Sequence, residues 1–193
     1  MAAQIRIGTS GWHYKHWCGP VYPKKCPSSQ WFDLYARVFD TVEVNNTFYR
    51  LPTEDALRNW RDAAPRKFCF SVKASRFITH IKRLRDPDNA ISLFFSRVEL
   101  LRSKLGPILF QLPPRWHVDP ERLADFLPAL PRGHRYVFEF RDESYPSHFQ
   151  PASAAQDCSL YSRLARIAVA DGANRRFHVY PVPWHNGKIP REL

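Results

Sequence analysis

Five short apolar runs, each followed by polar residues and separated by helix-like stretches, constrain the fold of this chain most strongly. The runs are Ile5–Ile7, Thr41–Val44, Phe68–Val72, Ile108–Phe110 and Tyr136–Phe140. Strands that alternate with helical patterns are typical of β/α units in a parallel sheet. Ligands of such folds bind at the carboxyl ends of the strands. The polar residues that follow the runs are therefore the first candidates for a site.

The spacing of the runs indicates how much of a barrel the chain can form. Their starts lie on average roughly 33 residues apart, and eight such units need about 260 residues, the usual size of a (β/α)₈ barrel. A chain of 193 residues has room for about five to six of the eight units. We therefore expect an α/β fold, a TIM-type (β/α) barrel that is incomplete. An open doubly wound sheet is the alternative, although Gly8, Gly11 and Gly19 are too scattered for a dinucleotide-binding loop.

Helix-start signals lie between the runs. Thr53 precedes two acidic residues and is expected to cap a helix that reaches Ala64. Asp119 followed by Pro120 predicts a second start, with the helix ending near Leu130. Ser28 or Ser29 can cap the helix before the second strand, and a further helix is expected over about 89–104.

Cysteine usage and hydropathy indicate the class of protein. Its four cysteines form no CxxC pair, so a zinc or redox site is poorly supported and a reduced, cytoplasmic protein is the simplest interpretation. No apolar run reaches the roughly 18–20 residues of a membrane span, and no secretory signal is recognisable at the N-terminus. We expect no membrane partner and no metal site, and the sequence identifies no cofactor.

The net charge of +11 favours anionic partners. The densest basic stretch, Arg76–Arg85, follows the third expected strand. It could face phosphate groups or nucleic acid, and the alternative is a solvated basic loop.

Two carboxylates lie inside apolar strands, where burial requires a charged partner. Glu43 and Glu139 occupy such positions, and Lys73, Arg76 and Arg141 are the candidate partners. Glu43, Lys73 and Glu139 are thus candidates for acid/base catalysis or for holding an anionic ligand. The alternative is a structural ion-pair network.

Further polar and aromatic residues near the strand ends could orient or stack on a ligand. Trp12, Phe48 and Tyr49 could stack on a sugar or base. The alternatives are that these rings only seal the core and that Asn45 is only a turn residue. The candidate ligand-binding residues are Ser10, Trp12, Asn45, Tyr49, Ser75, Arg76, His80, Gln111 and Arg141.

Six separated segments resemble one known family. They read IRIGTSGWHYKHW, VYP, FDTVEVNNTFYRLP, FSVKASRFITHIKRL, LGPILFQLPPRW and YVFEFRDESY. Together they resemble the YecE-like proteins, domain of unknown function family 72 (DUF72), over residues 5–145. The resemblance implies a TIM-type β/α barrel and implies no known activity.

The remaining residues, 146–193, form a divergent tail in which only Arg166–Ala170 is expected to be a strand. The family's Arg-x-His-Gly segment is absent from it. A one-nucleotide frame change could recover that segment, because HVYPVPWHNGKIP can be encoded so that the shifted frame reads TFIRFHGTTGKYR. A divergent or short family member is the alternative. We expect a barrel that lacks its last strands to be unstable or prone to aggregation.

The expected function is that of an uncharacterised DUF72-like protein. We expect it to bind a small polar or anionic ligand at the carboxyl ends of the strands, with the reaction unassigned. Two alternatives stay open: a nucleic-acid-binding module that uses the basic 76–85 loop, and a non-functional truncated remnant.

Overall fold

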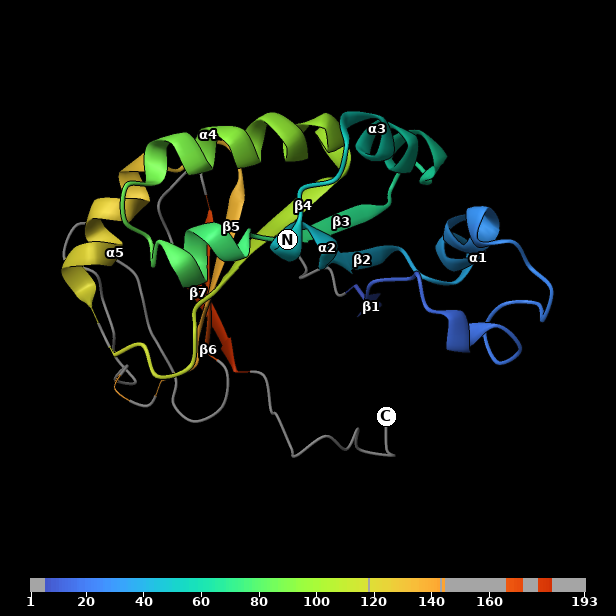
Figure 1. Ribbon diagram of the computed structural model, residues 1–193, viewed down its shortest axis with the longest axis horizontal. Helices are drawn as coiled ribbons and strands as arrows, with labels where there is room; N and C mark the ends of the chain where they lie inside the picture. Colours follow the sequence, from blue (N-terminus) through green and yellow to red (C-terminus); the bar gives the residue numbers. More distant parts are fainter. Residues whose placement is uncertain (1–5, 118, 143, 145–165, 172–176, 182–193) are drawn as a thin grey trace. The chain divides into compact units, whose positions relative to one another are not determined.

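A computed structural model of the chain describes residues 6–117, 119–142, 144, 166–171 and 177–181, the last two ranges as backbone strands (Figure 1). These residues contain a sheet whose strands follow one another in chain order. Five strands are parallel, as expected for an α/β fold: β1 (Gly8–Ser10), β2 (Thr41–Val44), β3 (Cys69–Lys73), β4 (Leu105–Gln111) and β5 (Arg135–Phe140). No helix of the described part is long and apolar enough to cross a membrane.

The chain forms two compact units, and β4 contributes residues to both. Unit 1 comprises Met1–Arg76 and Asn89–Ile108, and unit 2 comprises Phe77–Asp88 and Leu109–Leu193. Two β/α connections of unit 1 contain the helices α1 (Trp31–Val38), α2 (Asn46–Tyr49) and α3 (Glu54–Ala63). The helix α4 (Pro87–Val98) precedes β4, and α5 (Pro120–Phe126) precedes β5.

Two of the expected helix caps are confirmed. The backbone N–H of Ala56 donates to Thr53 Oγ1 (3.2 Å) at the start of α3. The N–H of Arg122 donates to Asp119 Oδ1 (3.1 Å) at the start of α5. The expected serine cap is wrong, because Ser28–Gln30 form a 3₁₀ turn and α1 begins at Trp31 without a side-chain cap.

Stacked aromatic rings form the core of each unit. In unit 1, the ring of Phe32 on α1 stacks on that of Phe70 on β3, with centroids 5.7 Å apart. In unit 2, Phe110 and Phe138 stack across β4 and β5 at 5.1 Å, and Phe126 of α5 packs edge-on against Phe110. Such rings bury about 150–250 Å² each, so they dominate the stability of both cores.

The first strand lies three residues later than the sequence suggests. Ile7 is 72% exposed, and the polar residues Gly8–Ser10 themselves form β1, paired in register with Thr41–Glu43 of β2. A Cβ at Gly8 would lie 2.2 Å from the carbonyl oxygen of Thr41. A glycine is therefore required where β1 meets β2, a contact with a distant segment of the chain that hydrophobicity alone does not indicate.

Two further segments differ from expectation. The basic stretch contains a π-helical turn, Phe77–Ile81, rather than a plain loop. The helix expected over 89–104 ends at Val98 and continues as a 3₁₀ segment, Glu99–Lys104, in which Arg102 has φ +51°.

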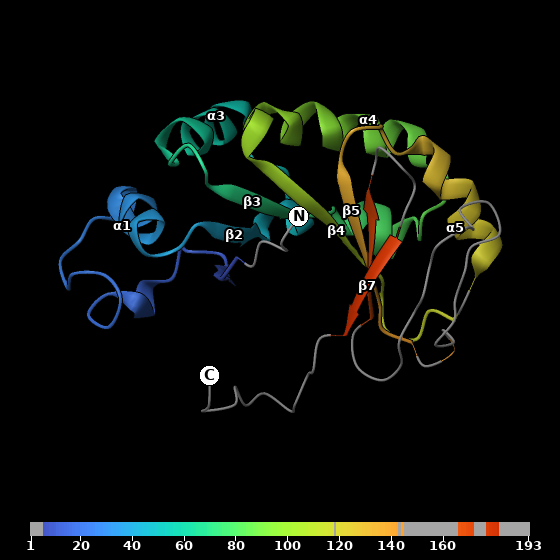
Figure 2. The ribbon, with the colours of Figure 1, turned by 180° about the vertical axis from the view of Figure 1, so that it is seen from behind.

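The sheet ends in an antiparallel arrangement, seen from behind in Figure 2. The expected strand near Arg166–Ala170 is present as β6 (Arg166–Asp171), but it pairs antiparallel with β5. A strand that the sequence did not indicate, β7 (Phe177–Pro181), pairs antiparallel with β6. The rest of the tail 146–193, including most of the segment that suggested a frame change, lies outside the described residues.

Candidate functional site

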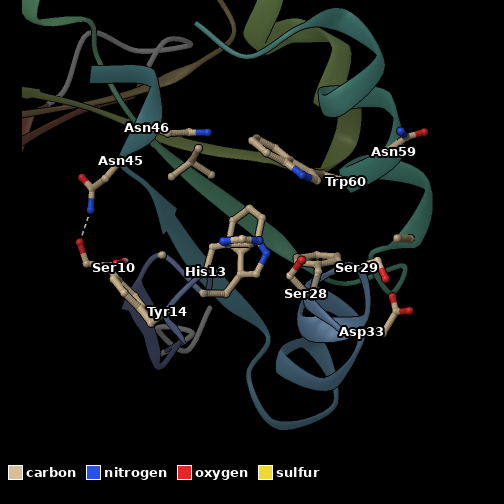
Figure 3. Close-up of a pocket in the computed structure, with 15 residues that line it drawn as sticks. Ser10, His13, Tyr14, Ser28, Ser29, Asp33, Asn45, Asn46, Asn59 and Trp60 are labelled. Carbon is tan, nitrogen blue, oxygen red and sulfur yellow. Dashed lines mark hydrogen bonds between the residues drawn. The ribbon is translucent and has the colours of Figure 1, made fainter. Parts of the chain in front are cut away.

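A cavity of about 610 Å³ lies in unit 1, where β1 and β2 end (Figure 3). This volume falls in the range of about 300–1,000 Å³ that is usual for small-molecule sites. Four parts of unit 1 contribute to its wall: the end of β1 with the loop after it, the end of β2, the 3₁₀ turn Ser28–Gln30 with the start of α1, and α3.

Local structure explains how two of these parts reach the cavity. Gly11 has φ +89°, a left-handed conformation that turns the chain after Ser10 and brings Trp12, His13 and Tyr14 to the wall. On α3, Asn59, Trp60 and Ala63 share one side of the helix because they are neighbours at a period of 3.6.

Three side chains form a hydrogen-bonded chain at the strand ends. Asn45 Nδ2 donates to Ser10 Oγ, and Ser10 Oγ donates to Glu43 Oε1 (3.2 Å). The other polar atom of the same amide, Asn45 Oδ1, is buried. Among the described residues it is the one buried side-chain nitrogen or oxygen that has no hydrogen-bond partner. Leaving such an acceptor unsatisfied costs about 1–3 kcal/mol. The atom is closed off from solvent, and therefore from a ligand in the cavity as it stands.

Aromatic rings form the middle of the cavity. Trp12 is 8% exposed and contacts Trp60 edge-to-face, with centroids 5.1 Å apart at 87°. Trp12 meets Phe32 at the same centroid distance and 62°. The buried hydroxyl of Tyr22 donates to the carbonyl of Trp12 (2.7 Å) and fixes the loop that carries it.

The charge at the cavity is opposite to that of the chain. In the described part of the protein no lysine or arginine lines it, and Asp33 is its one carboxylate. The polar groups are the amides of Asn45, Asn46 and Asn59 and the hydroxyls of Ser10, Tyr14, Ser28 and Ser29. The cavity can therefore exchange neutral hydrogen bonds and stack on a ring.

The structure brings some of the expected residues together and places others elsewhere. Ser10, Trp12 and Asn45 line the cavity, and Glu43 reaches it through Ser10. The expected partner Lys73 instead has its Nζ over the ring of Phe48 (4.9 Å). Within the described residues Glu43 makes no ion pair, which its half-exposed position allows.

The other candidates of unit 1 lie outside the cavity wall. Tyr49 is 79% exposed, and Ser75 is half-buried after β3. Arg76, the last residue of the first segment of unit 1, is exposed. In unit 2, the hydroxyl of Thr79 lies 2.8 Å from His80 Nδ1. These placements connect none of the four to the cavity.

A second polar cluster lies in unit 2, at the ends of β4 and β5. Gln111 Nε2 donates to Glu139 Oε2 (2.7 Å), and Arg141 Nε lies 3.8 Å from Glu139 Oε1. The expected pairing of Glu139 with Arg141 is thus present, as a long contact. Catalytic roles for Glu43, Lys73 and Glu139 stay predictions.

Asp142 follows this cluster and is held as a carboxylate. Hydrogen bonds from the side chain and backbone of Ser144 lower the pKa of Asp142, and His117 Nδ1 at 3.5 Å lowers it further. No group of three or more histidine, cysteine, aspartate or glutamate side chains among the described residues is placed to hold a metal ion.

Most of the cavity wall was not identified from the sequence. Among the lining residues missed, His13 lies in the loop after β1, whereas Ser28, Ser29, Asp33, Asn59 and Trp60 do not follow a strand. A helical period of 3.6 places Trp60 on the inward face of α3, but the same signal is expected of an ordinary core residue. Only the tertiary structure distinguishes a cavity-lining residue from an ordinary core residue at this position.

Comparison with known proteins identifies the family. The family described as "Protein of unknown function DUF72" matches residues 6–186. The chain belongs to the DUF72 family. The match confirms the resemblance carried by the six motifs.

Relatives of this DUF72 chain include two bacterial proteins. The UPF0759 protein YecE of Escherichia coli K12 is 32% identical over 178 residues, which cover 86% of this chain and 59% of YecE. The UPF0759 protein YunF of Bacillus subtilis is 29% identical over 126 residues, covering 62% of this chain and 44% of YunF. The chain thus spans less than two thirds of the length of these relatives.

Solved DUF72 structures have the same fold. A DUF72 protein of Thermotoga maritima superposes with a TM-score of 0.61 at 26% identity, covering 77% of this chain and 59% of that one. One of Enterococcus faecalis has a TM-score of 0.57 at 19% identity, with coverages of 74% and 52%, and shows the fold alone. The expected TIM-type α/β class agrees with these neighbours.

Proposed function

We propose that this DUF72 chain binds a small polar ligand in the cavity at the ends of β1 and β2. One observation carries the proposal: the cavity of about 610 Å³ combines aromatic rings with the amides of Asn45, Asn46 and Asn59 and with several hydroxyl groups. Small-molecule sites typically combine an apolar wall with a few polar groups that fix the orientation of the ligand.

The charge of the wall favours a neutral polar ligand over an anionic one. Lys73 and Arg141, the cations expected to hold an anion, contact Phe48 and Glu139 instead. An anion in the cavity would face Asp33 without a lysine or arginine of the described wall to compensate its desolvation.

A binding assay with a mixed panel tests the proposal. The probes are neutral sugars, sugar phosphates, nucleosides and dicarboxylates. Ligand-observed NMR measures the binding of each probe to the full chain. We expect at least one class to bind. Asn45→Ala should weaken that binding at least about tenfold, because Asn45 lines the cavity and holds the hydroxyl of Ser10 in its wall, and one such hydrogen bond is worth about 1.5 kcal/mol.

Asn89→Ala is the matched control, because Asn89 is exposed and lies outside the cavity wall. It should bind as the wild type does. Failure of every class to bind, or equal binding by Asn45→Ala, would refute the proposal.

A second candidate function is binding of nucleic acid by the basic stretch in unit 2. Arg83 and Arg85 are exposed there, together with the apolar side chains of Phe77 (46%) and Ile81 (63%). Exposed cations and an exposed aromatic ring within one short segment suit contact with phosphates and bases. Lys82 already pairs with Asp86 (3.2 Å), which reduces the charge available.

A further inference from the structure

We infer that the ligand of the cavity is a neutral carbohydrate. This inference rests on the proposed function and adds the class of the ligand. It follows from three features of the described wall: its charge, the angles between its aromatic rings, and the positions of its polar groups.

The charge of the wall disfavours anions. The chain has 29 lysine and arginine residues, yet none of those described lines this cavity, whose one carboxylate is Asp33. A phosphate or carboxylate would lose its hydration beside a like charge and gain no cation. A neutral ligand meets no such penalty.

The aromatic geometry favours stacking on a single face. Trp60 stands at 87° to Trp12, and Trp12 stands at 62° to Phe32. None of these pairs is parallel, so they provide no slot in which a flat base would be held between two faces. A sugar ring needs only one such face for its C–H side, because its edge carries hydroxyl groups.

The polar groups lie on two sides of this aromatic centre. Figure 3 shows Ser10, Asn45 and Asn46 on one side, Ser28, Ser29 and Asp33 on the other, and Trp60 with His13 between them. A sugar hydroxyl can pair with the exposed amide of Asn46, while hydroxyls at the opposite edge donate to the exposed carboxylate of Asp33. Each hydroxyl also accepts, so serine and amide donors are satisfied as well.

Titration with unmodified sugars tests the inference. The probes are glucose, mannose, galactose, xylose and disaccharides of glucose, each compared with its phosphate ester and with adenosine and cytidine. We expect a neutral sugar to bind more tightly than its phosphate ester. Asp33→Asn, a substitution of an exposed side chain that should leave the fold intact, should weaken sugar binding at least about threefold.

Variants of the aromatic face give an independent readout. We expect Trp60→Ala to weaken sugar binding at least about tenfold and Trp60→Phe to restore part of it, because a smaller aromatic face remains. Phe77→Ala, at an exposed aromatic ring of unit 2, is the control and should bind as the wild type does.

The outcomes separate this inference from the proposed function. If phosphate esters or nucleosides bind more tightly than neutral sugars, and Asn45→Ala loses that binding, the site is upheld and the carbohydrate inference is overturned. Sugar binding that survives both Trp60→Ala and Asp33→Asn overturns the inference too. If nothing binds, both fail.

Discussion

Tyr22 links the loop after β1 to the wall of the cavity. Its side chain is 1% exposed, its ring stacks on Trp31 (5.5 Å, 16°), and its hydroxyl donates to the carbonyl of Trp12. Burial raises the pKa of Tyr22 to about 12, and the proximity of Tyr35 adds to this. The neutral phenol is therefore the form that the folded chain holds.

A pH prediction follows for Tyr22. An unfolded tyrosine ionises near pH 10, so this contribution to stability is complete below about pH 10 and declines as pH rises to about 12. We expect Tyr22→Phe to be less stable than the wild type at pH 8 by about 1 kcal/mol, with a difference that shrinks as pH rises. Urea unfolding at pH 8 to 11 measures it, and parallel stability curves would contradict it.

At the scale of elements, glycine decides how closely neighbouring strands approach. At Gly8 on β1 an added Cβ would meet the Thr41 carbonyl at 2.2 Å, and at Gly106 on β4 it would meet Cys69 Sγ at 2.4 Å. Backbone and core atoms cannot move aside cheaply. Both strand contacts in unit 1 therefore depend on the absence of a side chain.

We expect Gly8→Ala to destabilise the chain by about 1–3 kcal/mol, because β1 must move away from β2. Chemical denaturation measures the loss. Gly133→Asn is the control: that glycine lies in open space with φ +88°, a conformation that asparagine tolerates. Equal stability of Gly8→Ala and the wild type would show that β1 does not pair as described.

The elements also show which local signals are reliable. Thr53 and Asp119 cap helices as predicted, because a cap is a contact between residues three apart. The position of β1 could not be predicted, because it depends on the fit of Gly8 against Thr41, 33 residues away. The antiparallel pairing of β6 with β5 likewise depends on contacts between distant segments.

At the scale of the whole molecule, the positive charge is unevenly distributed. The chain carries a net charge of +11, yet the described wall of the cavity contains no lysine or arginine. Long-range attraction of anions and recognition of the cavity ligand should therefore respond differently to salt. Exposed contacts are screened within about 10 Å at 0.1 M salt.

We expect unrelated single-stranded oligonucleotides to bind the chain at low salt and to dissociate as salt rises, with sugar binding unchanged. If the basic stretch forms the contact, Arg83→Gln with Arg85→Gln should reduce the slope of log K against log salt by about 1.4, for two phosphate contacts on a single strand. Fluorescence anisotropy measures the slope.

The control removes the same charge elsewhere. Lys24→Gln with Lys25→Gln neutralises two exposed residues in unit 1. Equal slopes for both double variants would mean that only net charge attracts the oligonucleotide, and that the basic stretch is not a specific surface.

The sequence by itself determined the β/α order, the family and three residues of the cavity wall, Ser10, Trp12 and Asn45, because periodicity, motifs and strand ends are local patterns. Only the tertiary structure decided that Asp33 and Trp60 join them, and that Lys73 turns to Phe48 rather than to Glu43. A cavity is the space between segments far apart in the chain. Its lining depends on strand register, on the turn at Gly11 and on helix rotation, which no short stretch of sequence encodes alone.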